Sequence, residues 1–277
     1  MPVQYIMKNT MTDYTTVKTA SKKERKILPE GWPRVLAHRG ACTRAPENTL
    51  AAFRIARELG ARGIELDVHL CASGELVVTH DHWLDRVAGI HRRIEDMTMD
   101  EIRQADASTY FGPLHPELPP GSFAGEGIPT LDEVFETVGK DMFLDIELKT
   151  DTNRCPALSQ AVAESIRKHN RNNCIVSSFN PFAIIDYRKH GDRPIAAIYC
   201  PYKSVPFFMR HREALYISRA AIKKPAVETA RASKRAETGS KPVLVWTVDS
   251  VDEADALLAK GVASIITNRI QDFARYY

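Results

Sequence analysis

Two carboxylates stand two residues apart in an otherwise apolar stretch of this chain. Glu65 and Asp67 alternate with three apolar residues, Ile64, Leu66 and Val68. Side chains i and i+2 of a β-strand point to the same face, so a strand here brings the two carboxylates together. Burying such a pair is costly unless a positive group accompanies it. A hard divalent cation is the natural partner, because it prefers oxygen ligands.

Other side chains capable of chemistry also lie in or directly after short apolar stretches. They are His38 and Arg39 after residues 35–37, His80 and Asp81 after residues 75–79, and Asp145, Glu147 and Lys149 within residues 142–149. Taken singly, each has an ordinary structural explanation, such as a core histidine or a lysine that reaches solvent. Their meaning depends on whether the fold brings them together.

The elements that must position these residues alternate regularly along the chain. Expected strands cover 35–40, 63–70, 142–149, 174–179, 194–199, 220–222, 242–248 and 263–267, and expected helices cover 48–60, 129–138, 155–170, 181–190, 225–237, 251–260 and a last stretch to Tyr277. About eight strand–helix units predict an α/β fold, a (β/α)8 TIM barrel with an insertion after the second strand. A doubly wound open sheet is the alternative, but no Gly-x-Gly-x-x-Gly follows the first strand.

The segment that interrupts this alternation is rich in proline. We expect an N-terminal extension over residues 1–30 and a single barrel domain over residues 31–277, with residues 82–128 as its insertion. The insertion contains four prolines between residues 113 and 120, which exclude long regular structure there.

Bulk properties exclude several classes of protein. A net charge of +3 is too mild to indicate nucleic acid as a partner. No apolar run is long enough to span a membrane. The five cysteines are scattered and form no Cys-x-x-Cys pair, which favours a reducing, cytoplasmic location. The oligomeric state is not determined by the sequence.

In a barrel, the ends of the strands meet at one mouth, so the polar residues above would converge. Three carboxylates, Glu65, Asp67 and Glu147, suit one Mg²⁺ or Ca²⁺ ion rather than zinc. Arg39 and Lys149 suit an anionic substrate, above all a phosphate. The two histidines, His38 and His80, offer a base and an acid near neutral pH. Cleavage of a phosphodiester uses all of these groups.

The order of these motifs resembles the glycerophosphodiester phosphodiesterase family. The matching blocks are Ala37-His38-Arg39-Gly40, Pro46-Glu47-Asn48-Thr49, Glu65-Leu66-Asp67-Val68, Val77-Val78-Thr79-His80-Asp81, Leu84-Asp85-Arg86, Ile128-Pro129-Thr130-Leu131, Ile146-Glu147-Leu148-Lys149, Ser177-Ser178-Phe179, Trp246-Thr247-Val248-Asp249 and Ile265-Ile266-Thr267-Asn268. They span roughly residues 34–270 in the family's order. The sequence departs from the family pattern at Val87-Ala88, where two threonines are usual, and at Asn268, where aspartate is frequent.

The resemblance implies a function and a role for individual residues. Members hydrolyse a glycerophosphodiester to glycerol 3-phosphate and an alcohol, with the neighbouring glycerol hydroxyl often drawn as the first nucleophile. By this resemblance His38 and His80 are the acid–base pair, Arg39 and Lys149 contact the phosphate, and Trp246 lines the substrate pocket. Glu65, Asp67 and Glu147 are by the same resemblance the metal ligands. Glu47 is assigned either to the site or to the start of a helix.

Two other functions remain open at this level. A lysophospholipase D-type phosphodiesterase acting on lyso-lipids needs an apolar wall beside the site, for which Phe207, Phe208 and Met209 are candidates. A non-catalytic protein that binds phosphate esters would use the same polar residues without turnover. The leaving alcohol and the order of the two histidines as base and acid are also left open.

Overall fold

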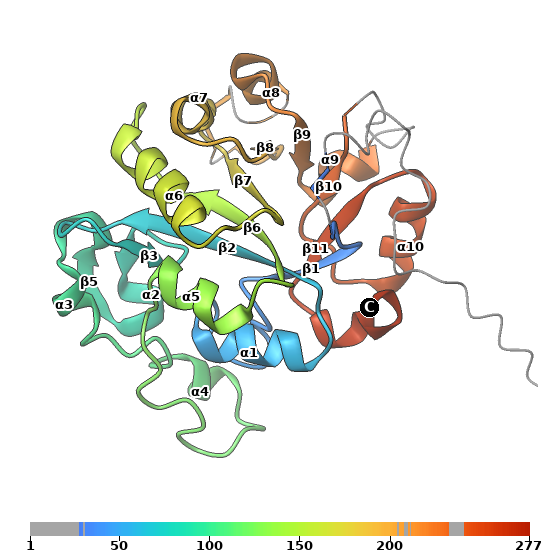
Figure 1. The fold of residues 1–277 in the computed structure, drawn as a ribbon. Coiled ribbons are helices and arrows are strands. Elements are labelled where there is room, and N and C mark those ends of the chain that lie inside the picture. Colours follow the sequence, from blue (N-terminus) through green and yellow to red (C-terminus); the bar gives the residue numbers. More distant parts are fainter. Residues whose placement is uncertain (1–27, 30, 204, 208–209, 211, 233–240) are drawn as a thin grey trace, which may run out of the picture.

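The protein is a barrel of parallel strands surrounded by helices. The structure is a computed structural model, and it describes residues 28–29, 31–203, 205–207, 210, 212–232 and 241–277. Figure 1 shows the helices packed around the outside of the strands. The N-terminal extension expected over residues 1–30 falls almost entirely outside the described residues and stays a prediction.

Eight parallel strands form the barrel wall in the described part of the chain. They are β1 (Val35–His38), β2 (Gly63–Leu70), β6 (Phe143–Leu148), β7 (Cys174–Ser178), β8 (Ile195–Tyr199), β9 (Ile222–Pro225), β10 (Leu244–Val245) and β11 (Ser264–Thr267). Their order around the wall is β10-β11-β1-β2-β6-β7-β8-β9. Single parallel bridges, Lys223 to Val243 and Ala226 to Trp246, connect β9 with the β10 segment and nearly close the ring. The predicted (β/α)8 barrel is therefore confirmed.

Several of the helices that follow the strands begin at residues suited to helix starts. They are α1 (Leu50–Glu58), α5 (Leu131–Val138), α6 (Pro156–Lys168), α7 (Pro181–His190), α8 (Glu213–Ser218), α9 (Val227–Ala232), α10 (Val251–Ala259) and the 3₁₀ segment η4 (Ile270–Tyr276). Thr49 and Thr130 cap α1 and α5 through their hydroxyl oxygens. Proline occupies the first position of α6 and α7, where its missing N–H costs nothing.

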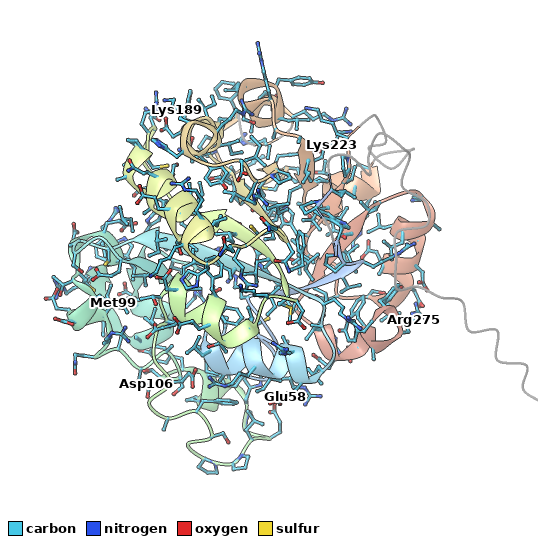
Figure 2. The ribbon with its side chains drawn as sticks, viewed as in Figure 1. Glu58, Met99, Asp106, Lys189, Lys223 and Arg275 are labelled. Atoms are coloured by element: carbon cyan, nitrogen blue, oxygen red, sulfur yellow. The ribbon has the colours of Figure 1, made fainter. Side chains whose placement is uncertain are left out.

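Between β2 and α5 the chain leaves the barrel. The strand β3 (Leu76–Val78) folds back antiparallel on β2, and a small subregion follows. It contains β4 (Trp83–Leu84), α2 (Asp85–Ala88), β5 (Ile90–Arg93), the 3₁₀ turn η2 (Ile94–Asp96), α3 (Met99–Ile102) and α4 (Phe111–Leu114). Its own apolar cluster includes Leu84, Ile94 and Ile102. In Figure 2, Met99 and Asp106 mark this subregion at the side of the barrel.

The alternation of the strands divides the core into two parts. Outward residues such as Leu66, Leu144 and Val176 pack under the helices. Inward residues at the strand starts, including Leu36 and Phe143, fill the bottom of the barrel with apolar side chains. The polar residues come two and four positions later on the same inward face, so they occupy the upper half of the barrel.

One strand lies elsewhere than the sequence indicates. The sequence predicts a strand at residues 220–222 and a helix at 225–237, whereas β9 runs from Ile222 to Pro225 and α9 from Val227 to Ala232. The remainder of the expected helix lies outside the described residues. The pattern is misleading because Lys223 and Lys224 are typical of an exposed turn, yet both side chains are buried.

Candidate active site

The turn after β1 brings a histidine and an arginine to the mouth of the barrel. Arg39 has a positive φ of 56° and Gly40 one of 81°. A Cβ on Gly40 would lie 2.8 Å from the backbone of Ala52, so only glycine lets α1 approach this turn. The Nδ1–H of His38 donates to the side-chain oxygen of Asn268 at 2.6 Å. Its Nε2 consequently carries the lone pair, and it lies 3.7 Å from Oε2 of Glu65.

The three carboxylates expected to bind a metal are together. Each of Glu65, Asp67 and Glu147 offers an oxygen, and these atoms lie within 4.8 Å of one another. The parallel register of β2 and β6 explains this, because Asp67 stands directly beside Glu147. All three side chains are buried. The strands therefore produce a compact oxygen cluster from two segments that lie far apart in the sequence.

Two basic side chains compensate the negative charge of Asp67 and Glu147 in this cluster. Nζ of Lys149 lies 3.0 Å from Oδ1 of Asp67 and 2.6 Å from Oε1 of Glu147. Nε of Arg39 lies 3.3 Å from Oδ2 of Asp67. Burial alone would raise the pKa of Asp67, but the charges of Lys149 and Arg39 hold that pKa well below its usual range. Asp67 is therefore a carboxylate, the form that binds a cation.

A second lysine, Lys224, lies below the first and was missed by the sequence analysis. Its Nζ is 2.9 Å from Oδ2 of Asp145 and 3.3 Å from Oε1 of Glu65, and it donates to the Ser177 hydroxyl at 3.1 Å. Burial disfavours its charge, yet the neighbouring carboxylates raise its pKa above the usual value. Two residues after inward-facing Ile222, Lys224 must face inward as well, and that spacing was the available signal.

The second expected catalytic histidine is held by a chain of ionic contacts. Nδ1 of His80 donates to Oδ1 of Asp81 at 2.6 Å, and Nε of Arg86 donates to the other oxygen of Asp81 at 2.5 Å. Arg86 also binds Glu47, which in turn accepts from Nη1 of Arg39 at 2.9 Å. The sequence left Glu47 either in the site or at the start of a helix. In the structure its carboxylate binds Arg39 and Arg86, and it thereby connects the turn after β1 with α2.

His80, Asp81 and Arg86 border an open cleft of about 500 Å³. Its lining comprises His80, Asp81, His82, Trp83, Asp85, Arg86, Lys149 and Asp151. His80 is also close enough to Asp67 for its charge to lower the pKa of that carboxyl. The cleft adjoins the carboxylate cluster through Lys149, which lines the cleft and contacts Asp67 and Glu147, and it is large enough for a small polar substrate.

The aromatic residues near the site differ in position. Trp246 donates its indole N–H to the backbone carbonyl of Lys224 at 3.0 Å. Its ring also packs against Phe179 in a T-shaped arrangement, with 5.5 Å between the ring centroids. Phe207 is 73% exposed, and the other two residues of the apolar wall required by a lyso-lipid substrate lie outside the described residues. The one described residue of this expected wall is therefore mostly exposed to solvent.

The carboxylate cluster fits a divalent cation. Oε2 of Glu65 is buried and has no hydrogen-bond partner among the described residues. Such an oxygen is costly to bury unless a cation or a solvent molecule satisfies it. Three carboxylates form an all-oxygen ligand set, which suits Mg²⁺ or Ca²⁺.

No helix among the described residues is long and apolar enough to cross a membrane.

Comparisons with known proteins agree with this geometry. The family model described as glycerophosphoryl diester phosphodiesterase matches residues 38–272. A glycerophosphodiester phosphodiesterase of Caldanaerobacter subterraneus subsp. tengcongensis is 37% identical over 237 residues, which cover 84% of this chain and 93% of the relative. A second, from Bacillus altitudinis, is 30% identical over 244 residues, covering 85% and 94% of the two chains.

Solved structures of the same fold are similar along most of the chain. One is an Oleispira antarctica phosphodiesterase in complex with the product sn-glycerol-3-phosphate, with a TM-score of 0.71 and 26% identity. The match covers 87% of this chain and 95% of that one. A glycerophosphodiester phosphodiesterase from Thermotoga maritima gives a TM-score of 0.65 and 27% identity, covering 88% and 98%. This chain therefore belongs to the glycerophosphoryl diester phosphodiesterase family, a family of hydrolases.

Proposed function

We propose that this protein hydrolyses glycerophosphodiesters to glycerol 3-phosphate and an alcohol. The observation that carries the proposal is the buried carboxylate cluster with two histidines near it, His38 at the end of β1 and His80 in the loop after β3. Nε2 of His38 lies 3.7 Å from Oε2 of Glu65, and the charge of His80 contributes to lowering the pKa of Asp67. The product bound to the Oleispira antarctica phosphodiesterase is of the same chemical class as the product proposed here.

The cluster would hold one divalent cation, Mg²⁺ or Ca²⁺, through Glu65, Asp67 and Glu147. Such a cation supplies positive charge that offsets the negative charge developing on the phosphoryl oxygens. Arg39 and Lys149 surround Asp67 and add two further cationic groups for the phosphate. Lys224 instead contacts Glu65 from below, where it orients that carboxylate.

The partners of the two histidines favour one order of proton transfer. Asn268 fixes the Nδ1–H tautomer of His38, because its own amide N–H₂ donates to Asp249 at 2.9 Å and only its oxygen faces the ring. His38 then presents a lone pair at Nε2, which suits a base that takes the proton of the attacking hydroxyl. Its partner is a neutral amide.

His80 has a charged partner instead. Asp81 accepts from its Nδ1–H, and the carboxylate compensates the charge of an imidazolium ring. Nε2 of His80 is then the position from which a proton reaches the leaving alkoxide, which is otherwise a poor leaving group. We therefore assign His38 as the base and His80 as the acid.

The first experiment measures release of glycerol 3-phosphate from glycerophosphocholine. The protein is assayed after treatment with EDTA and again with Mg²⁺ or Ca²⁺ added back. Release that depends on the cation is the expected result. Release from lyso-lipid alone would favour the lysophospholipase D-type reaction. Retained affinity for glycerophosphocholine without any turnover would make this a binding protein and overturn the proposal.

A second experiment separates the two histidines. His38→Ala and His80→Ala should each lose about 10²- to 10⁴-fold in kcat on glycerophosphocholine. With a p-nitrophenyl leaving group, which needs no protonation, His80→Ala should recover most of its activity and His38→Ala should not. His115→Ala serves as the control, because His115 pairs with Glu117 at 3.0 Å and neither residue lines the cleft. Recovery by His38→Ala alone would reverse the assignment.

The remaining expectations concern location and partners. All five cysteines are free, as expected in a reducing compartment. We infer a cytoplasmic location on this basis, which cell fractionation would test. The proposed partner is a small-molecule glycerophosphodiester.

A further inference from the structure

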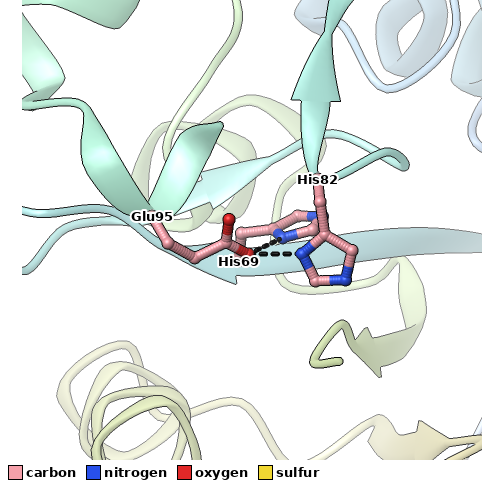
Figure 3. Close-up of side chains that lie close together, drawn as sticks. All are labelled: His69, His82 and Glu95. Atoms are coloured by element: carbon pink, nitrogen blue, oxygen red, sulfur yellow. Dashed lines mark hydrogen bonds and ion pairs between the residues drawn. The ribbon is translucent and has the colours of Figure 1, made fainter. Parts of the chain in front are cut away.

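A second group of potential metal ligands lies beside the carboxylate cluster. His69 is the next residue on the inward face of β2 after Glu65 and Asp67, and it is fully buried. Figure 3 shows it facing His82, from the loop after β3, and Glu95, from η2. Nδ1 of His69 lies 3.1 Å from Oε1 of Glu95, and Nδ1 of His82 lies 2.5 Å from the same oxygen.

The hydrogen bonds of His69 leave one contact unexplained. Its Nε2 lies 3.2 Å from the backbone carbonyl oxygen of His80, which only accepts, so Nε2 carries the hydrogen. In the neutral ring Nδ1 then holds a lone pair, and this lone pair faces Glu95. Nη2 of Arg93 lies 3.3 Å from the other oxygen of Glu95, so this carboxyl already has one cationic partner. Two lone pairs at this distance repel each other, so either a proton on Nδ1 or a metal cation must stand between them.

We propose that His69, His82 and Glu95 bind a transition-metal cation of the Zn²⁺ class, at a site separate from the carboxylate cluster. The three residues offer ligand atoms within 4.8 Å of one another. Tetrahedral Zn²⁺ with bonds of about 2.0–2.1 Å separates its ligand atoms by roughly 3.3 Å. The contact of His69 with Glu95, at 3.1 Å, is close to this separation, whereas the 2.5 Å contact of His82 with Glu95 has to widen when the ion binds. Two imidazoles and one carboxylate suit this metal, whereas the all-oxygen cluster suits Mg²⁺ or Ca²⁺.

The surroundings of the site also match a metal centre. A metal-bound histidine usually donates its other ring N–H to a carbonyl or carboxylate, and His69 does so to His80. His82 is 24% exposed and lines the open cleft, which gives a cation access from solvent and leaves room for water as a further ligand. The bound cation would tie β2 and η2 to the loop that carries His80.

The test uses the full chain, with Zn²⁺ as the probe and excess Mg²⁺ present throughout. Mg²⁺ occupies the oxygen ligands and competes poorly for imidazole. Metal content after equilibrium dialysis should reach one Zn²⁺ per chain, and Zn²⁺ should raise the unfolding temperature. His82→Asn and Glu95→Gln should each weaken Zn²⁺ binding at least about tenfold and lose the temperature rise.

Two matched variants separate this site from its neighbours. His91→Asn removes an exposed histidine of the same subregion and should bind Zn²⁺ like the wild type. Glu147→Gln disables the carboxylate cluster and should retain Zn²⁺ binding, so failure of the proposed reaction would not affect this result. A wild type without Zn²⁺ in excess Mg²⁺, or equal binding by His82→Asn and Glu95→Gln, would overturn the proposal. In that case a proton on His69 explains its contact with Glu95.

Discussion

Two layers of the same barrel use the same spacing of acidic residues for different purposes. In the upper layer Asp67 stands beside Glu147, and in the lower layer Glu65 stands beside Asp145. Each layer has its own lysine, but Lys149 is 13% exposed whereas Lys224 is 2% exposed. The upper layer therefore faces the cleft and can exchange its ammonium contacts for substrate or metal. The lower layer is more deeply buried, and its Glu65 is the one carboxylate there that joins the proposed metal ligands of the upper layer.

The two layers also differ in the acidity of their carboxyl groups. Asp67 and Asp145 are both fully buried, yet the pKa of Asp67 is lowered and that of Asp145 is raised. For Asp145 burial is the largest influence and outweighs the charge of Lys224 and the hydrogen bond from Ser177. Burial is opposed in Asp67 by two cations, Lys149 and Arg39. At equal depth, the number of cationic partners therefore decides the direction of the pKa shift.

The largest expected difference between the two layers is in activity when one carboxyl of each is neutralised. Glu147→Gln removes an anionic ligand from the upper layer but keeps an oxygen for Lys149, so it should fold and lose at least about 100-fold in activity at limiting Mg²⁺. The matched lower-layer variant, Asp145→Asn, should lose much less. Steady-state assays over a range of Mg²⁺ concentrations measure both. Equal losses would show that the layers do not divide the work as described.

The next largest effect concerns stability. Lys224→Met leaves Asp145 and Glu65 buried without their ammonium partner and should lower the free energy of unfolding by about 3–5 kcal/mol. Denaturant unfolding measures this change. Adding Asp145→Asn to the same chain should restore much of the loss, because one unpaired charge is then removed.

A surface pair provides the control for this variant. Lys168 binds Asp132 and is 67% exposed, so Lys168→Met should cost only about 0–1 kcal/mol. If Lys224→Met were no more costly than Lys168→Met, the lower layer would not depend on its buried ammonium.

The opposite pKa directions of two buried carboxyls predict opposite contributions to stability as pH changes. Asp67 has a lowered pKa in the folded state, so its contribution is present above about pH 4, the unfolded value, and is lost as pH falls below it. Asp145 has a raised pKa, so its contribution is present below about pH 4 and is lost as pH rises through the folded value. The two carboxyls therefore give the stability profile slopes of opposite sign.

Unfolding measured as a function of pH checks both signs. Asp67→Asn should flatten the loss of stability below about pH 4. Asp145→Asn should make stability rise more steeply with pH above that point, because the opposing contribution is gone. Parallel pH profiles for the wild type and both variants would contradict the assignment.

The smallest effect is expected at the edge of the site. Trp246→Phe keeps an aromatic ring against Phe179 but loses the indole hydrogen bond to the Lys224 carbonyl, worth about 0.5–1.5 kcal/mol. If Trp246 lines the substrate pocket, as the family resemblance implies, we expect a rise of a few-fold in KM with little change in kcat. An unchanged KM with lowered stability would assign Trp246 to packing alone.

The sequence predicted the residues that follow a clear pattern and missed those that do not. Glu65, Asp67 and Glu147 alternate with apolar residues, so their common face was readable. The family resemblance, confirmed by the match over residues 38–272, supported the same positions. Lys224 was missed because Lys-Lys-Pro is typical of a strand end or a turn, and only the barrel wall makes this segment a buried strand.

Contacts between distant segments were beyond sequence reasoning for a different reason. Asn268 was noted only as a departure from the family pattern, yet it sets the tautomer of His38 across 230 positions of sequence. The pairing of His69 with Glu95 likewise depends on how the subregion after β3 folds back on β2. Such partners share no local pattern, since each depends on the closure of a long loop.

The sequence by itself determined the order of most barrel strands and helices, α8 being the helix that it did not predict, as well as the inward face of β2 and β6 and the residue types available for phosphodiester chemistry. These follow from periodicity and side-chain chemistry, which are local properties. Only the tertiary structure decided which charges became partners, because closing the barrel places Lys224 under Glu65 and Lys149 over Asp67. The acidity and accessibility of each carboxyl follow from those contacts, and no property of a single segment specifies them.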